Sequence, residues 1–308
     1  MKIYIIGTGG VGGYFGGKLA LVDGQDVTFV ARGANYEAIK ANGLKVNTTD
    51  GELIINPANV IQDFSEIVEP DLIMFCVKTY DSEAVARELN DYVKPETVVI
   101  SFQNGIQNDL VIKKQLKNCP VFPGVAYVIS SKHAPGVITQ NGGRKKLFFG
   151  ARAETKVSAA TKLIFKEFET ICHNAGIDAT LSEDIASDIW RKFVFISAFS
   201  GMTALCRSCI GIIREDDFTA AVYSDCLKEA IAVAKALKVD LPKNIFDEAL
   251  DTTLNKTEYS SKSSLLLDIE NKRRNEIEVL NGALVRLARE NNVEVPINKA
   301  IYAAIKLL

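Results

Sequence analysis

Short apolar runs recur along the first half of the chain and predict the strands of a β-sheet. They are rich in β-branched and aromatic residues and are separated by turns and by segments with helical spacing. The runs span residues 3–6, 26–32, 72–78 and 97–103, and helices are expected near 18–22, 33–42 and 82–92. Because strands alternate with helices, the pattern predicts parallel βαβ units in a doubly wound sheet.

Further short runs extend this pattern. Residues 44–61 alternate weakly around Asp50-Gly51, which predicts a β-hairpin. Runs at 121–130, 136–140 and 146–149 are expected to complete the same sheet, and a helix is expected at 157–175.

The second half has the pattern of long helices. It contains no proline between Pro135 and Pro242, and 17 of the 21 glycines lie at or before Gly150. Helices are expected after Ser182 as N-cap, over 218–237 and from Ser263 through a last long helical region. The predicted fold class is α/β: an N-terminal Rossmann-type doubly wound sheet (residues 1–181) with a C-terminal all-helical domain (residues 182–308).

Composition and charge restrict the partners. The 308 residues are 47% hydrophobic and 24% charged, as in an ordinary globular protein, and the net charge of −2 gives no reason to expect nucleic acid or an anionic membrane. The longest uncharged apolar stretch, Phe193–Cys206, is too short for a bilayer span, and the start of the chain has no signal-peptide layout. Six scattered cysteines and two histidines do not make a metal site. We expect a cytoplasmic protein without metal.

A glycine motif follows the first strand. Gly7, Gly9 and Gly12 have G-x-G-x-x-G spacing between a strand and a helix. The first glycine permits a tight turn, the second lets the backbone approach a pyrophosphate, and the third lets the helix pack on the strand. The helix N-terminus attracts phosphates. The alternative is a turn needed only for packing. We predict that a dinucleotide binds through Gly7, Thr8, Gly9, Gly10, Val11 and Gly12.

The residue after the second strand indicates which dinucleotide binds. An NAD site usually places an acidic residue there, roughly 20 residues beyond the glycines, on the ribose 2′-hydroxyl. Arg32 occupies this position, and a guanidinium suits a 2′-phosphate because it can donate two hydrogen bonds to it. NADP is therefore favoured over NAD, unless Arg32 is a solvated residue that closes a strand. Lys78 and Asn104 also stand at strand ends, where ligands of such sheets bind.

Three polar residues of the second half are ambiguous from the residues alone. Lys192 lies where its helix turns strongly apolar, so it is either a partly buried functional lysine or one that snorkels to water. Ser264 and Asp268 lie one helical turn apart. Glu276 lies in a charged stretch whose composition favours a solvated face over a site.

These motifs together resemble the ketopantoate reductases, also called 2-dehydropantoate 2-reductases, over the whole chain. The matching pieces are Gly7–Gly12, Ala31-Arg32, Val77-Lys78, Gln103–Gly105, Trp190–Lys192, Ser263–Asp268 and Glu276–Gly282. The resemblance implies a Rossmann domain and a helical domain with the active site in the cleft between them. It also implies NADPH-dependent reduction of the 2-oxo group of ketopantoate, a step of pantothenate biosynthesis.

The resemblance also assigns roles to single residues. It matches Lys192 to a catalytic lysine and Glu276 to its partner carboxylate. An ammonium there would stabilise the negative charge on the ketone oxygen and deliver a proton. The resemblance places further residues at the nicotinamide ribose or at the substrate: Lys78, Asn104, Ser264 and Asp268.

The substrate half departs from the family pattern. The family often carries asparagines four and eight residues after the lysine and another further along, where this chain has Ile196, Ser200 and Ile210. Ser200 keeps a hydroxyl for the substrate, but Ile196 cannot hydrogen-bond. The identity of the 2-oxo acid therefore stays open.

Three functions remain possible from the sequence. The first is a reductase of this family that acts on ketopantoate or another small 2-oxo acid. The second is another dehydrogenase with a helical second domain, and the third is a non-catalytic NADP-binding sensor. Retention of both Lys192 and Glu276 argues against the sensor. A homodimer is compatible with all three.

Overall fold

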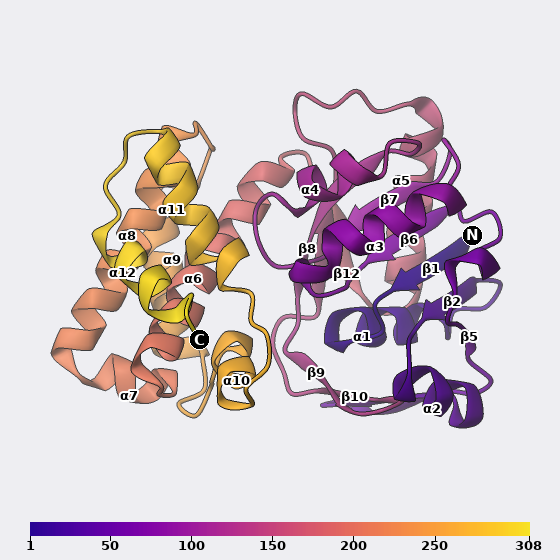
Figure 1. The fold of residues 1–308 in the computed structure, drawn as a ribbon, viewed down its shortest axis with the longest axis horizontal. Coiled ribbons are helices and arrows are strands. Elements are labelled where there is room, and N and C mark those ends of the chain that lie inside the picture. Colours follow the sequence, from indigo (N-terminus) through magenta and orange to yellow (C-terminus); the bar gives the residue numbers. More distant parts are fainter. The chain divides into compact units, whose positions relative to one another are not determined.

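The computed structural model describes all residues 1–308 and divides them into two compact units. The sheet unit contains residues 1–103 and 107–185, and the helical unit contains residues 104–106 and 186–308. In Figure 1 the helical unit is mainly orange and yellow. None of the helices combines the length and hydropathy of a membrane span.

An eight-stranded sheet forms the centre of the sheet unit, in the order β12-β11-β8-β7-β6-β1-β2-β5. Its strands are β1 (Lys2–Ile6), β2 (Asp26–Val30), β5 (Asn59–Ile61), β6 (Leu72–Phe75), β7 (Val98–Ser101), β8 (Val121–Tyr127), β11 (Lys146–Phe149) and β12 (Asp178–Leu181). The strands from β5 to β8 are parallel to their neighbours, whereas β11 is antiparallel to β8. These six parallel strands have the order of a dinucleotide-binding sheet, which confirms the predicted fold class.

Helices cover both faces of this sheet because successive residues of a strand point to opposite sides. In β1, Ile3 and Ile5 belong to the apolar cluster that includes residues of α1 and α5, whereas Tyr4 and Ile6 belong to the cluster that includes residues of α3 and α4. The helices of this unit are α1 (Gly10–Leu19), α2 (Ala34–Asn42), α3 (Ser82–Leu89), α4 (Asn108–Gln115) and α5 (Ala159–Asn174).

A second, four-stranded sheet, called the side sheet here, has the order β4-β3-β10-β9. It contains β3 (Leu44–Thr48), β4 (Gly51–Ile55), β9 (Ser130–Ala134) and β10 (Val137–Gln140). The predicted hairpin is confirmed as β3–β4, and the runs at 121–130 and 146–149 join the main sheet as β8 and β11, but the prediction that residues 136–140 complete it is wrong. This run is β10, which pairs in parallel with β3 and antiparallel with β9 rather than with a strand of the main sheet.

The glycines of α1 bring this helix close to the main sheet on one side. A Cβ atom added to Gly12 would lie 2.9 Å from Cγ2 of Ile5, and one added to Gly16 would lie 2.9 Å from Cε1 of Phe29. Real Cβ atoms do not approach neighbours so closely, because protein interiors are already close-packed. Both positions therefore require glycine for the observed packing.

The same helix also packs closely on the side sheet. A Cβ atom added to Gly13 would lie 2.5 Å from Cγ1 of Ile138, and one added to Gly17 would lie 3.0 Å from Cγ2 of Val46. Ile138 and Val46 are fully buried. Thus α1 lies between two sheets, and a different pair of its glycines faces each one.

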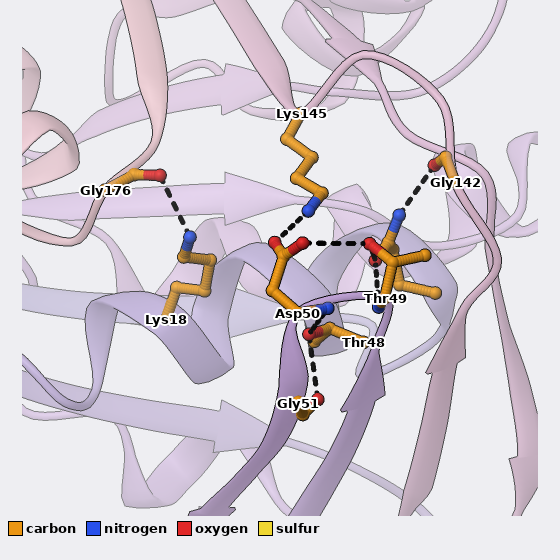
Figure 2. A network of polar contacts seen from close by, with 9 residues as sticks. Lys18, Thr48, Thr49, Asp50, Gly51, Gly142, Lys145 and Gly176 are labelled. Carbon is orange, nitrogen blue, oxygen red and sulfur yellow. Dashed lines mark hydrogen bonds and ion pairs between the residues drawn. The ribbon is translucent and has the colours of Figure 1, made fainter.

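Polar contacts hold the C-terminal end of α1 and the tip of the side sheet (Figure 2). Lys18, in the last turn of α1, donates a 2.9 Å hydrogen bond to the carbonyl oxygen of Gly176, before β12. Asp50, at the tip of the β3–β4 hairpin, forms an ion pair with Lys145. The buried side chain of Gln140 accepts a 3.1 Å hydrogen bond from the backbone of the hairpin.

The helical unit is built from α6 (Ile185–Cys206), α7 (Ile210–Glu215), α8 (Asp217–Ala236), α9 (Ile245–Asp251), α10 (Ser264–Glu270), α11 (Asn281–Glu290) and α12 (Pro296–Ile305). The prediction of one long helical region after Ser263 is wrong. The helix ends at Glu270, and α11 begins only at Asn281, after the charged residues 270–276. α6 begins at Ile185, so it does not start directly after Ser182. The short α4 and β12 had no strong sequence pattern and were not predicted.

Candidate functional site

The glycine motif forms the turn between β1 and α1, and its three glycines differ in their surroundings. Gly7 has φ +98°, and an added Cβ atom would lie 2.7 Å from the backbone nitrogen of Val77. Gly9 precedes α1 without a side-chain cap, and nothing lies within 4 Å of an added Cβ atom. Gly9 thus leaves open space beside the start of α1, and the N–H groups of a helix start can bind a phosphate group.

The other loop residues hold this turn in place. Thr8 is buried, and its hydroxyl donates a 3.0 Å hydrogen bond to the carbonyl oxygen of Val30 at the end of β2. The carbonyl oxygen of Thr8 accepts a 3.2 Å hydrogen bond from the side chain of Asn35 in α2. Gly10 packs against the backbone of Ser130, and Val11 is half-buried. The phosphate loop is thereby tied to β2 and α2.

Arg32 lies just beyond β2, with more than half of its side chain exposed. Its Nη2 atom lies 2.8 Å from Oε2 of Glu88, and its guanidinium stands 5.4 Å from the centre of the Phe64 ring. The following Gly33 has φ +56° and open space beside it, and α2 begins directly after it. The guanidinium and the start of α2 together offer positive charge and N–H donors to an anion.

A buried amide joins the ends of β6 and β7. The side-chain nitrogen of Gln103 donates 2.7 Å hydrogen bonds to the carbonyl oxygen of Val77 and to the hydroxyl of Ser82. Its side-chain oxygen accepts a 3.0 Å hydrogen bond from Ser101. Lys78 follows Val77 directly and is half-buried. Gln103 thus fixes the turn that carries Lys78. The motif Gln103–Gly105 in the sequence does not indicate this role of Gln103.

Lys192 of α6 is a lysine in a desolvated setting within the helical unit. Its Nζ atom donates a 2.7 Å hydrogen bond to Oδ1 of Asn104. Burial lowers the pKa of the Lys192 ammonium from its usual 10.5 to about 8, and the nearby carboxylate of Glu276 opposes part of this shift. This ammonium can lose its proton near neutral pH, so it can act as an acid.

A buried amide network joins α6, which carries Lys192, to α11 and α12, which follow Glu276 in the chain. Asn281 and Asn298 are fully buried, and Nδ2 of Asn281 lies 2.9 Å from Oδ1 of Asn298 and 3.3 Å from the carbonyl oxygen of Ser197. Ser197 lies five residues after Lys192 in α6, and Asn281 lies five residues after Glu276. The network therefore fixes α6 against the start of α11, next to both ionisable groups.

The expected substrate-contact residues differ in their exposure. Ser200 is buried in α6, and Ile196, one turn from Lys192, is half-buried. Ile210 is fully buried at the start of α7, so this position belongs to the core.

In α10 the structure separates two neighbouring serines. Ser263 caps the helix and accepts a 2.7 Å hydrogen bond from Thr203, whereas Ser264 is exposed. Asp268 is buried, and its Oδ1 atom lies 3.0 Å from Nε of Arg273. Nowhere do three or more His, Cys, Asp or Glu side chains gather to hold a metal.

Two family models match the chain. The model of ketopantoate reductase PanE/ApbA matches residues 3–154, and that of the PanE/ApbA C-terminal region matches residues 184–308. The chain belongs to the ketopantoate reductase family. This family consists of oxidoreductases that reduce a 2-oxo acid with a pyridine nucleotide.

Individual relatives align over nearly their full length. The 2-dehydropantoate 2-reductase of Pyrococcus horikoshii is 30% identical, with 99% of this chain and 97% of the relative covered. The uncharacterised oxidoreductase YkpB of Bacillus subtilis is 26% identical, with 100% and 98% covered. The crystal structure of a PanE/ApbA family ketopantoate reductase from Ralstonia eutropha JMP134 superimposes with a TM-score of 0.89 at 28% identity, covering 100% and 98%. D-mandelate dehydrogenase, with a TM-score of 0.87 at 21% identity, shares the fold.

The different surroundings of Gly9 and Gly12 lead to a first prediction. Gly9→Ala adds a methyl group to open space, so it should leave thermal stability nearly unchanged and weaken dinucleotide binding at least about tenfold by blocking the phosphate. Gly12→Ala should instead lower stability by about 1–3 kcal/mol through overpacking. Calorimetric titration with the dinucleotide and thermal unfolding measure the two effects. A Gly9→Ala variant with unchanged affinity would contradict the placement of the phosphate.

Proposed function

We propose that this protein catalyses the NADPH-dependent reduction of ketopantoate to pantoate, a step of pantothenate biosynthesis. Membership of the ketopantoate reductase family supports the reaction class. The observation that carries the proposal is the partly buried Lys192, whose ammonium has a lowered pKa and binds Asn104. A cytoplasmic location and a homodimer stay predictions.

In this proposal Lys192 is the general acid. NADPH supplies the hydride to the ketone carbon, and negative charge then develops on the ketone oxygen. The Lys192 ammonium stabilises this charge and transfers one proton to the oxygen, so that the 2-oxo acid becomes a 2-hydroxy acid. A pKa of about 8 favours the transfer at neutral pH, because the group is still largely protonated but releases its proton readily.

Two neighbours prepare Lys192 for this role. The carboxylate of Glu276 keeps the ammonium protonated, since an opposite charge favours the charged form. Asn104 accepts one of its three N–H donors at 2.7 Å and so fixes the direction of the amine. Gly105 follows with φ +118°, a conformation that glycine adopts easily, and this turn sets the position of Asn104.

We propose that the glycine loop binds the pyrophosphate of NADPH through the start of α1, and that Arg32 binds its 2′-phosphate. The support is the open space at Gly9 and Gly33, together with the guanidinium beside the start of α2. Lys78 and Asn104 are proposed to contact the nicotinamide ribose and the substrate. Ser200, Ser264 and Asp268 are proposed to contact or surround the substrate.

The apolar Ile196 supports a second candidate, a reductase for a different 2-oxo acid. A panel assay separates the candidates: NADPH oxidation is followed with ketopantoate and with 2-oxo acids that lack its terminal hydroxyl. Highest kcat/KM with ketopantoate supports the first candidate, and highest kcat/KM with a more apolar acid supports the second. Dinucleotide binding without turnover of any acid would indicate a non-catalytic sensor and overturn the proposal.

Removal of the Lys192 amine tests the general acid. Lys192→Ala should lower kcat by about 10²–10⁴-fold, because the proton donor is lost, and should change the Kd of NADPH little. Steady-state kinetics and calorimetry measure the two quantities. Lys235→Ala, which removes an exposed lysine of α8, is the control and should keep wild-type kcat.

The pH dependence gives an independent readout of the same prediction. The acid is present below the pKa of Lys192, so the rate of ketone reduction should be constant at low pH and fall about tenfold per pH unit above about 8. Oxidation of the 2-hydroxy acid needs the neutral amine and should rise over the same range. A fall in reduction rate at the same pH in Lys192→Ala would assign the titration to another group.

Arg32 tests the choice of cofactor. Arg32→Ala should raise the Kd of NADPH by about tenfold or more, since a hydrogen bond to a charged group contributes about 1.5–3 kcal/mol. The Kd of NADH should stay nearly unchanged because NADH has no 2′-phosphate. Fluorescence titration with both cofactors measures the ratio, and an equal loss for both would contradict the assignment.

Ile196 tests the substrate. Ile196→Asn should lower the KM for ketopantoate, because a restored hydrogen bond to a polar substrate group contributes about 0.5–1.5 kcal/mol, or up to about tenfold. The KM for 2-oxo acids without the terminal hydroxyl should rise or stay the same. A wild-type enzyme that already has a low-micromolar KM for ketopantoate and is impaired by Ile196→Asn would show that Ile196 does not face that hydroxyl.

A further inference from the structure

An acidic residue, Glu88, lies at the proposed 2′-phosphate site, although an anionic phosphate needs no acidic neighbour. Glu88, near the end of α3, accepts a 2.8 Å hydrogen bond from Nη2 of Arg32. The two residues are 56 positions apart in the chain, and their side chains are 56% and 50% exposed. Glu88 therefore reaches the guanidinium from a separate element, at the edge that a ligand approaches.

This ion pair leaves Arg32 able to bind a second anion. The guanidinium has five N–H donors, and Glu88 is bonded to only one of its nitrogens. The ring of Phe64 is buried, and the guanidinium lies over it at 5.4 Å from its centre, so the ring supports the guanidinium independently of Glu88. Loss of the Glu88 charge would therefore not release Arg32 from its position.

A second carboxylate also lies in the field of Arg32. A hydrogen bond from the backbone N–H of Ser65 is the main cause that lowers the pKa of Asp63, and the charge of Arg32 lowers it further. The proposed 2′-phosphate site thus has one guanidinium, that of Arg32, and two carboxylates around it, those of Glu88 and Asp63. A 2′-phosphate that enters it meets one cation that is already partly neutralised, and it meets like-charge repulsion from Glu88.

We infer that Glu88 is a specificity residue that competes with the cofactor's 2′-phosphate for Arg32 and so weakens the preference for NADPH over NADH. This inference rests on the proposed assignment of Arg32 to the 2′-phosphate. NADH brings no 2′-phosphate to Arg32, so Glu88 neither competes with it nor repels it there. Because the ion pair is half-exposed, the effect is modest and is screened by salt.

Cofactor binding to the whole protein tests this inference. Glu88→Gln should lower the Kd of NADPH by about two- to fivefold at low salt and leave the Kd of NADH unchanged, and the gain should shrink as salt rises. Glu83→Gln is the matched control, because it removes the same charge from an exposed position of the same helix. It should change neither Kd.

The double variant distinguishes the inference on Glu88 from the cofactor assignment of Arg32. In an Arg32→Ala background, Glu88→Gln should no longer favour NADPH beyond the small loss of general repulsion, so the two substitutions should not be additive. If Arg32→Ala weakens NADPH binding but Glu88→Gln leaves the ratio of the two Kd values unchanged, only the inference on Glu88 is overturned. If Arg32→Ala affects both cofactors equally or neither, the cofactor assignment and this inference are overturned together.

Discussion

The close approach of α1 to two sheets is the constraint on which the sheet unit depends. Gly12 and Gly16 meet the main sheet, and Gly13 and Gly17 meet the side sheet, at distances that leave little or no room for a Cβ atom. This contact sets the position of the helix start, where Gly9 has open space beside it. The position of the proposed phosphate site therefore depends on these four glycines further along the helix, because the lack of side chains there allows the close packing.

In the helical unit the main constraint is the stabilisation of the Lys192 ammonium, which is poorly solvated. Lys192 would be unfavourable there without partners, and Asn104 and Glu276 supply a hydrogen bond and an opposite charge. The buried side chains of Asn281 and Asn298 hydrogen-bond to each other through Nδ2 of Asn281, whose Oδ1 atom has no partner. Such polar clusters fix one relative placement of the helices more strictly than apolar contacts do, because hydrogen bonds require a narrow geometry.

The features that could be predicted from the sequence are those encoded by residues close together in the chain. The glycine spacing after an apolar run predicted the dinucleotide-binding sheet, and the resemblance singled out Lys192, which the residues alone left undecided. The side sheet was missed because its pairing is non-local: β10 lies beside β3 across about 90 residues of chain, and no short pattern encodes that choice. The contact between Arg32 and Glu88 was missed for the same reason. The roles of Ser263 and Ser264 differ by helix register alone, which a sequence motif does not show.

The composition of α1 has a consequence for folding. Five of its ten residues are glycine, and each lowers intrinsic helix stability by about 1 kcal/mol relative to alanine. The helix therefore depends on its packing against both sheets, and a substitution that loosens the side sheet would also weaken α1 and the phosphate loop at its start.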